Sequence, residues 1–266
     1  WHLQTMGRGP GLLLLHGTGA SSHSWAGLMP LLSDRFEILA PDLPGHGLSE
    51  LAAAPGMSLP GMADLIANLL AHLQFSPALV AGHSAGAAIL ARMCLDRQLH
   101  PRALVSVNGA LLALPGLTGR FFSGSARLLA SIPAVPSWVA GLGGRRAFTQ
   151  RLIEGTGSVL EPEGVERYRR LVGHPPHVAA ALNMMASWDL ETLEAELGAL
   201  TLPVHLVTCE NDRTVPPSQS EALAARVAQA ELHRVAGLGH LGHEENPALF
   251  AALFADIWDS TREPER

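Results

Sequence analysis

Short apolar runs alternate with helix-like stretches along much of the chain. Residues Gly11 to Leu15 and Phe36 to Ala40 are apolar at almost every position, and each run leads into a loop that contains Gly or Pro. A strand of a parallel sheet shows this pattern when helices cover both of its faces. We therefore expect two buried strands whose carboxyl-terminal loops are candidate site loops.

The same alternation predicts further elements on either side of a middle segment. Strands that alternate with helices form βαβ units, so the predicted fold class is α/β, with a mostly parallel central sheet flanked by helices. The expected strands are Ala78 to Ala81, Arg102 to Val107, Val204 to Cys209 and Leu232 to Val235, and the expected helices are Ser58 to Leu73, Ala85 to Leu95, Ser218 to Ala228 and Pro247 to Trp258.

The middle segment, residues 111–190, breaks this alternation. Its sequence is biased toward helix and is interrupted repeatedly by Pro and Gly. We therefore divide the 266 residues into an α/β core, residues 1–110 and 191–266, and an inserted helical cap, residues 111–190.

The composition excludes several classes of protein. The longest apolar runs, such as Leu12 to Leu15, are far shorter than the roughly 20 residues of a membrane-spanning helix. The net charge of −6 argues against nucleic-acid binding, which needs an excess of cations. The two cysteines, Cys94 and Cys209, give neither a disulfide framework nor a metal-ligand spacing. No metal and no cofactor are expected, and a reducing compartment fits.

A candidate nucleophile lies between an expected strand and an expected helix. Residues Gly82 to Gly86 read Gly-His-Ser-Ala-Gly, the G-x-S-x-G pattern in which small residues permit a strained turn that exposes the serine hydroxyl. The pattern alone arises by chance in roughly one protein in ten or twenty. Its position between strand and helix therefore carries the prediction that Ser84 is a nucleophile and not an idle residue of a Gly-rich turn.

A nucleophilic serine needs a base and an acid that orients the base. Asp212, in the loop after the expected strand that ends at Cys209, is the predicted acid, and Glu210 is the alternative because it is nearer the strand end. His240, on a Gly-rich loop after the last expected strand, is the predicted base, with His243 as the alternative. The order Ser, Asp, His favours catalysis over metal binding, for which the two histidines lack a third ligand.

The oxyanion of an acyl-transfer reaction needs hydrogen-bond donors. They are expected from the backbone after the nucleophile and from the loop that follows an early strand. The predicted donors are therefore the N–H groups of Ala85 and Thr18. Four further polar residues are expected mainly to brace loops: His16, His46, His83 and Asp42.

Five short motifs together resemble the α/β-hydrolase superfamily over nearly the whole chain: His16 to Gly19, Pro41 to Gly47, the Ser84 turn, Asn211-Asp212 and Gly239-His240. Within it, the runs His16 to Ser24, Gly82 to Met93 and Asn108 to Leu111 resemble the magnesium chelatase accessory proteins of bacteriochlorophyll synthesis. The chain differs from haloalkane dehalogenases and most epoxide hydrolases of this fold, which have Asp where this chain has Ser84.

The narrower resemblance implies a photosynthetic bacterium and a role near magnesium insertion into protoporphyrin. Magnesium chelatase is then a candidate partner, and the expected location is the bacterial cytoplasm, with peripheral attachment to a membrane as the alternative. The resemblance does not supply a physiological substrate.

The composition of the predicted cap is the main indication of the kind of substrate. It combines apolar residues with eight Arg and five acidic residues, which suggests a hydrophobic ligand with carboxylates, such as a porphyrin. The alternative is that the Arg side chains solvate the outer face of the cap. The candidate substrate contacts are His83, Phe121, Phe122 and Trp138.

Three functions fit these residues. The first is hydrolysis of a small hydrophobic carboxylic ester or amide through an acyl-enzyme. The second is carbon–carbon bond hydrolysis by the same three residues under a different cap. The third is a porphyrin-binding accessory role in magnesium chelation, with the triad intact but idle.

Overall fold

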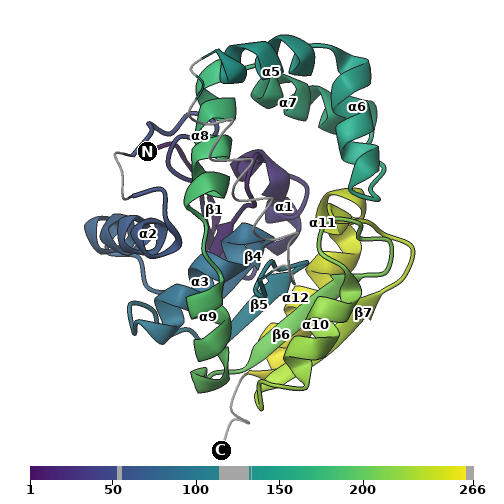
Figure 1. The fold of residues 1–266 in the computed structure, drawn as a ribbon. Coiled ribbons are helices and arrows are strands. Elements are labelled where there is room, and N and C mark those ends of the chain that lie inside the picture. The colour runs from purple at the N-terminus through teal and green to yellow at the C-terminus, as the bar shows by residue number, and fades with distance from the viewer. Residues whose placement is uncertain (53–55, 114–131, 133, 262–266) are drawn as a thin grey trace, which may run out of the picture.

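The computed structural model describes residues 1–52, 56–113, 132 and 134–261, and within them the strands form one seven-stranded sheet (Figure 1). The strand order is β1-β3-β2-β4-β5-β6-β7. β1 pairs antiparallel with β3, and all other neighbours pair in parallel. The strands are β1 (Leu3–Gly7), β2 (Gly11–Leu15), β3 (Glu37–Pro41), β4 (Pro77–His83), β5 (Ala103–Val107), β6 (Val204–Cys209) and β7 (Ala230–Val235).

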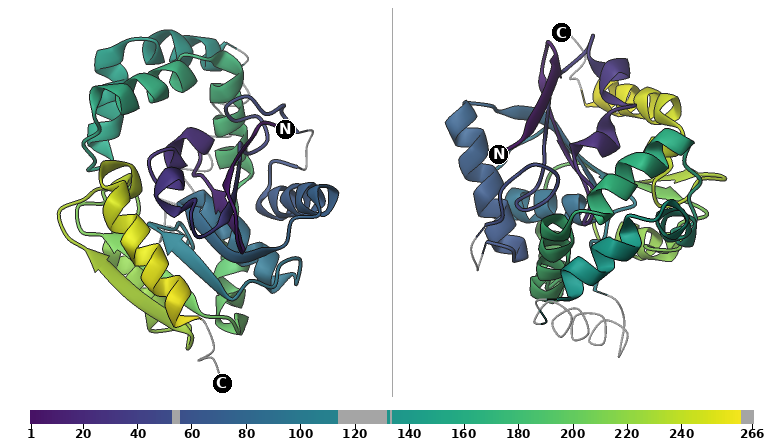
Figure 2. Two further views of the ribbon diagram at one scale, coloured as in Figure 1. Left: turned by 180° about the vertical axis from the view of Figure 1, so that it is seen from behind. Right: turned by 90° about the horizontal axis from the view of Figure 1, so that it is seen from above.

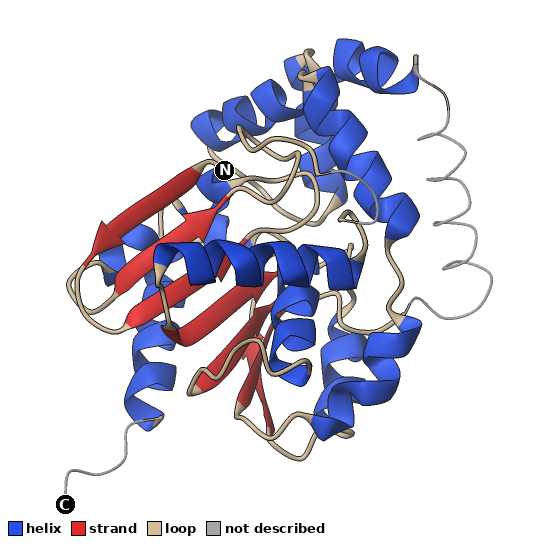
Figure 3. Ribbon diagram, turned by 90° about the vertical axis from the view of Figure 1, so that its left-hand side faces the viewer, coloured by secondary structure: helices blue, strands red, loops and turns tan. Residues whose placement is uncertain are grey.

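Helices cover both faces of this sheet. The helices α2 (Leu59–Leu73), α3 (Ala85–Leu95) and α10 (Pro217–Ala224) share one hydrophobic cluster with the sheet, which the short helix α9 (Glu191–Glu196) joins. The opposite face is covered by α1 (Met29–Leu32) and α12 (Pro247–Ser260), which lie together in Figure 2, left. Figure 3 shows the twist of the sheet between the two layers.

A second hydrophobic cluster, on the face covered by α1 and α12, holds the C-terminal helix against the sheet. Phe250 and Phe254 of α12 are fully buried and belong to the same cluster as Val207 of β6 and Val235 of β7. Burial of one such side chain stabilises the fold by about 1.5 to 3 kcal/mol. The α/β class and the mostly parallel sheet predicted from the sequence are confirmed.

A third group of helices lies across one end of the sheet (Figure 1). It contains α5 (Val135–Gly143), α6 (Arg146–Gly155), α7 (Pro162–Val172) and α8 (Pro175–Ser187), which pack on one another. We call these four helices the helical layer. Short helices complete the described chain: η1 (Ser22–Trp25), η2 (Leu197–Ala199) and α11 (Gly242–Glu245). None of the helices in the described ranges has both the length and the apolar character needed to cross a bilayer.

Candidate active site

Ser84 occupies a strained turn between β4 and α3. Its backbone has φ 52° and ψ −117°, a conformation that is unusual for a residue with a side chain. The neighbouring glycines are required by close packing: a Cβ on Gly82 would lie 2.4 Å from the backbone N of Ala87, and one on Gly86 would lie 2.3 Å from the carbonyl oxygen of Leu15. The glycines of the motif therefore permit the turn, and Ser84 remains partly accessible at its tip.

Asp212 and His240 are brought together from the loops after β6 and β7. Nδ1 of His240 lies 2.7 Å from Oδ2 of Asp212, and both side chains are buried. The second oxygen of Asp212, Oδ1, accepts hydrogen bonds from the backbone N–H groups of Thr214 at 2.7 Å and Val215 at 2.9 Å. The carboxylate is thus fixed by its own loop, and it directs the Nδ1 proton of His240 toward itself, which leaves Nε2 as the basic nitrogen.

The two alternative residues lie elsewhere. The side chain of Glu210 is exposed to solvent. His243 is fully buried, and its Nε2 shares a hydrogen bond of 2.8 Å with Oγ of Ser24. Burial lowers the pKa of His243 to about 3, so the ring is neutral. The geometry therefore pairs Asp212 with His240 and gives neither alternative that position.

Two side chains, those of His83 and Asn108, donate hydrogen bonds to the backbone of the loop that carries His240. Nε2 of His83 donates to the carbonyl oxygen of His240 at 2.9 Å, and Nδ2 of Asn108 donates to the same oxygen at 2.9 Å. Burial, reinforced by the adjacent rings of His240 and His243, holds the pKa of His83 well below its usual value. His83 is 2% exposed, and its hydrogen bond braces the loop of His240. This agrees with the first of its two predicted roles, that of a loop brace, and gives no support to the second, that of a substrate contact.

Asn108 is a site residue that sequence analysis did not identify. It follows β5 with a positive φ of 46°, and its Oδ1 accepts from the backbone N–H of Cys209 at 2.8 Å. Its amide nitrogen also approaches the carbonyl oxygen of Gly239 at 3.2 Å. One side chain thus ties the end of β6, which leads to Asp212, to the loop of His240. A polar residue that tolerates positive φ directly after a buried strand is the one sequence signal that could have identified it.

The loop after β2 lies against the Ser84 turn. A Cβ on Gly17 would lie 3.0 Å from the Cβ of Ser84, so the backbone next to Thr18 is close to the predicted nucleophile. Ala85 is the first residue of α3, and the first N–H groups of a helix have no partner within it. The two predicted oxyanion donors therefore belong to segments beside Ser84. The Thr18 hydroxyl is directed at Sδ of Met184 in α8, 3.4 Å away.

His16 and Asp42 brace the loops around this turn, as predicted. Nδ1 of His16 donates to the carbonyl oxygen of Gly17 at 2.8 Å, and its Nε2 accepts from the backbone N–H of Leu43 at 2.9 Å. Burial lowers the pKa of His16 to about 4, so this neutral arrangement persists at physiological pH. Asp42 accepts from the N–H groups of Ser22 at 2.7 Å and Leu48 at 2.9 Å.

The segment that joins α6 to α7 in the helical layer contacts the two loops that carry Asp212 and His240. The carbonyl oxygen of Thr156, just after α6, accepts from the backbone N–H of Arg213 at 3.1 Å. Oγ of Ser158 accepts from the backbone N–H of Leu241 at 2.8 Å. Between them, Gly157 has φ +88°, and a Cβ on it would lie 1.9 Å from the carbonyl oxygen of Asn211. The segment 156–158 therefore packs backbone to backbone on both loops.

The buried carboxyl of Glu244 in α11 provides a second connection, from the helical layer to α11 and η1. The hydroxyls of Tyr168 in α7 and Ser24 in η1 both lie 2.6 Å from Oε1 of Glu244. Burial raises the pKa of Glu244 to about 7 and that of Tyr168 well above its usual value. A third connection comes from α8, where the ring of His177 approaches Gly47 N and Gly19 O, each at 3.1 Å.

The other predicted substrate contacts have different positions. Phe121 and Phe122 lie outside the described residues. Trp138, on α5, is 67% exposed. Arg145, Arg146 and Arg151 are exposed, while the Arg side chains of α7 pair with Glu163 and Glu166 of the same helix. The six described Arg residues of the predicted cap thus support the interpretation that they solvate its outer face.

The fold and the strained serine turn are characteristic of one class of protein, the α/β hydrolases. The chain belongs to the alpha/beta hydrolase family, whose model matches residues 12–253. A solved structure, an alpha/beta hydrolase fold protein from Burkholderia ambifaria, superposes with a TM-score of 0.78 at 29% identity and covers 96% of this chain and 93% of that one.

Two relatives indicate where in the family the chain lies. It is 42% identical over 236 residues to the magnesium-chelatase 30 kDa subunit of Rhodobacter capsulatus, which covers 89% of this chain and 82% of that protein. It is 28% identical over 239 residues to a pimeloyl-[acyl-carrier protein] methyl ester esterase of Aeromonas hydrophila, covering 84% and 85% of the two chains. Both resemblances stated from the sequence motifs are thereby confirmed.

Proposed function

We propose that the protein is a serine hydrolase that cleaves a carboxylic ester or amide through a Ser84–His240–Asp212 triad. The observation that carries this proposal is the buried 2.7 Å contact between Asp212 and Nδ1 of His240. It selects the imidazole tautomer whose Nε2 is free to take a proton. The strained turn supplies the nucleophile, and the relationship to a methyl ester esterase supports ester chemistry.

In this mechanism Nε2 of His240 removes the hydroxyl proton of Ser84 as its Oγ attacks the substrate carbonyl. The backbone N–H groups of Ala85 and Thr18 stabilise the oxyanion that forms. The imidazolium of His240 then gives its proton to the departing alcohol or amine, which leaves an acyl-enzyme. Water, deprotonated by His240, attacks the acyl group and releases the acid and the free serine.

The helical layer is the element proposed to select the substrate. It lies at the carboxyl ends of β6 and β7, where the Asp212 and His240 loops begin, and the segment 156–158 between two of its helices packs on both loops. Met184 of α8 places an apolar side chain beside Thr18, one of the predicted oxyanion donors, which suits a hydrophobic acyl or alcohol group.

A second candidate function is an accessory role in magnesium chelation, with a porphyrin as ligand and magnesium chelatase as partner. The identity of 42% to a magnesium-chelatase subunit favours it. In that role the triad is retained without turnover, and the same residues bind a ligand without cleaving it.

Active-site labelling separates the two functions. A fluorophosphonate probe should label wild-type protein stoichiometrically, and Ser84→Ala and His240→Ala should abolish labelling. A hydrolase should also turn over some member of a panel of p-nitrophenyl esters, porphyrin methyl esters and diketones, and the preferred member distinguishes ester from carbon–carbon bond hydrolysis. Absence of labelling in a folded wild-type protein would reject the hydrolase and favour the accessory role.

A further inference from the structure

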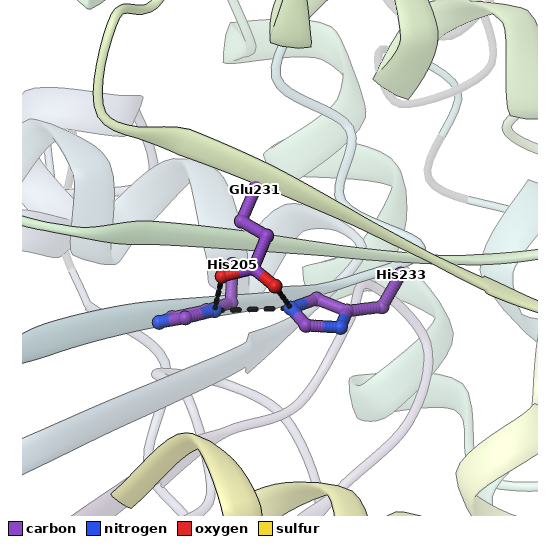
Figure 4. Close-up of side chains that lie close together, drawn as sticks. All are labelled: His205, Glu231 and His233. Carbon is purple, nitrogen blue, oxygen red and sulfur yellow. Dashed lines mark hydrogen bonds and ion pairs between the residues drawn. The ribbon is translucent and has the colours of Figure 1, made fainter. Parts of the chain in front are cut away.

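Three potential metal ligands lie side by side on the last two strands of the sheet. His205 is the second residue of β6, and Glu231 and His233 lie on β7. The parallel register pairs His205 with Glu231. Side chains two residues apart on a strand point to the same face, so His233 shares that face with Glu231. Figure 4 shows the three side chains converging from the two strands.

The polar atoms of the three side chains face one another. Nδ1 of His205 lies 3.0 Å from Nε2 of His233, and the two oxygens of Glu231 lie 3.6 Å from the first nitrogen and 3.8 Å from the second. Zinc bonds of about 2.0 to 2.2 Å in a tetrahedron separate neighbouring ligand atoms by about 3.3 to 3.5 Å. One ligand atom from each of the three side chains lies within 4.8 Å of the other two. A modest rotation of the exposed Glu231 side chain would therefore place all three ligand atoms on one ion.

Burial increases from one side of this cluster to the other. The side chain of Glu231 is 66% exposed, that of His233 is 20% exposed, and that of His205 is 6% exposed. An ion can thus reach the cluster from solvent past Glu231 and contact a nitrogen held by the sheet. The other ring nitrogen of His205 has no hydrogen-bond partner among the described residues, so this buried ring makes its polar contacts on the cluster side.

The ligand types favour one group of metals. Imidazole nitrogens suit zinc, copper, nickel and cobalt, whereas magnesium prefers oxygen ligands and retains its water. Two neutral imidazoles and one carboxylate carry a single negative charge, so the complex with a divalent ion carries a net charge of +1 at a site open to solvent. Three protein ligands also leave room in a tetrahedron for one water molecule or another small ligand.

The cluster lies at the opposite end of the strands from the candidate active site. His205 is near the beginning of β6, while Asp212 follows the end of that strand. The four residues from His205 to Cys209 alone span about 13 Å. An ion bound at the cluster would therefore not touch Ser84, and its site is independent of the proposed hydrolase function.

We propose that His205, Glu231 and His233 form a binding site for a divalent transition-metal ion, with zinc as the best-fitting member of that class. This departs from the expectation of no metal site. The ligands come from two segments that only the sheet register brings together.

The test is zinc binding by the full chain after removal of metals with a chelator. Equilibrium dialysis should find a zinc site in the wild type whose affinity falls at least about tenfold in His233→Gln. Glu231→Gln, at an exposed position, should weaken it too without affecting folding. Cobalt at the same site should give visible absorption bands of low coordination number, which both variants should lose. Excess Mg²⁺ should not displace the zinc.

Two controls separate this site from other histidines. His72→Gln changes an exposed histidine of α2, and His240→Ala removes the imidazole of the triad. Both should bind zinc as the wild type does. Equal zinc affinity in wild type, His233→Gln and Glu231→Gln would overturn the proposal, as would loss of the site in His240→Ala or its displacement by Mg²⁺. Circular dichroism of each variant establishes that it is folded.

Discussion

Replacing Asp212 with asparagine tests the proposed mechanism at the point where the geometry is most specific. The asparagine side chain has the size of the aspartate, but one of its two oxygens becomes an NH₂ group. Oδ1 of residue 212 accepts from the N–H groups of Thr214 and Val215, so the amide oxygen must stay there. The NH₂ group is then directed at Nδ1 of His240, where Oδ2 now lies at 2.7 Å.

This exchange reverses the hydrogen bond to the imidazole. Nδ1 must accept, so the ring proton moves to Nε2, which can no longer take the proton of Ser84. In serine proteases the same substitution lowers kcat by about 10⁴-fold. At about 1.36 kcal/mol per factor of ten, the expected loss is about 5.5 kcal/mol of transition-state stabilisation. The geometry of the loop should be unchanged.

The measurement is the rate of fluorophosphonate labelling and of ester hydrolysis in Asp212→Asn against wild type. Glu210→Gln is the matched control, because it removes an exposed carboxylate two residues earlier on the same loop and should leave both rates unchanged. A rate for Asp212→Asn within tenfold of wild type, with Ser84→Ala inactive, would refute the assigned role of Asp212.

Three further outcomes are expected. The carboxyl of Glu244 has a pKa raised to about 7, so its contribution to stability is complete below about pH 4.5 and is lost as pH rises through 7. Urea unfolding at pH 5 and pH 8 should therefore show the wild type losing up to about 3 kcal/mol of unfolding free energy relative to Glu244→Gln. An equal change in unfolding free energy in the two proteins would contradict this. Gly82→Ala should lower the free energy of unfolding by about 3 kcal/mol or prevent folding, because the added Cβ would lie 2.4 Å from backbone atoms. Gly141→Ala is the control: a Cβ there has nothing within 4 Å, so thermal unfolding should show it to be neutral or stabilising. Asn108→Ala should lower kcat more than it raises KM in ester hydrolysis, because it loosens the loop of His240; a change in KM alone would argue against a positioning role.

The central strands and helices could be predicted because each has a strong local signal. β2, α3 and β6 begin and end where the apolar pattern predicts. β4 extends two residues beyond its predicted end, to His83, because His83 still pairs with Val107 of β5. The apolar pattern of one segment carries no information about the strand that pairs with it. β1 was not predicted: Leu3–Gly7 mixes polar with apolar residues and is half exposed at the edge of the sheet. α10 ends at Ala224, four residues before the predicted end.

The candidate site was partly predictable for the same reason. Ser84 has a local motif, and Asp212 and His240 follow strands that are themselves recognisable. The choice between Asp212 and Glu210 depends on a turn in which the N–H of Asp212 donates to the carbonyl oxygen of Cys209, and spacing alone does not reveal it. The role of Asn108 depends on partners 101 to 132 residues away in the chain. Contacts of that separation exist only once the sheet is assembled.

The segment 156–158 has a consequence for protein engineering within this family. Exchanging helices α5–α8, which are proposed to select the substrate, for those of a relative is a direct way to test that role. Here such a chimaera would also exchange the carbonyl of Thr156 and the hydroxyl of Ser158, which hold the loops of Asp212 and His240. A graft that changes only the helices and keeps Thr156, Gly157 and Ser158 should preserve the reactive geometry, whereas a graft cut at the sheet boundary should alter specificity and rate together.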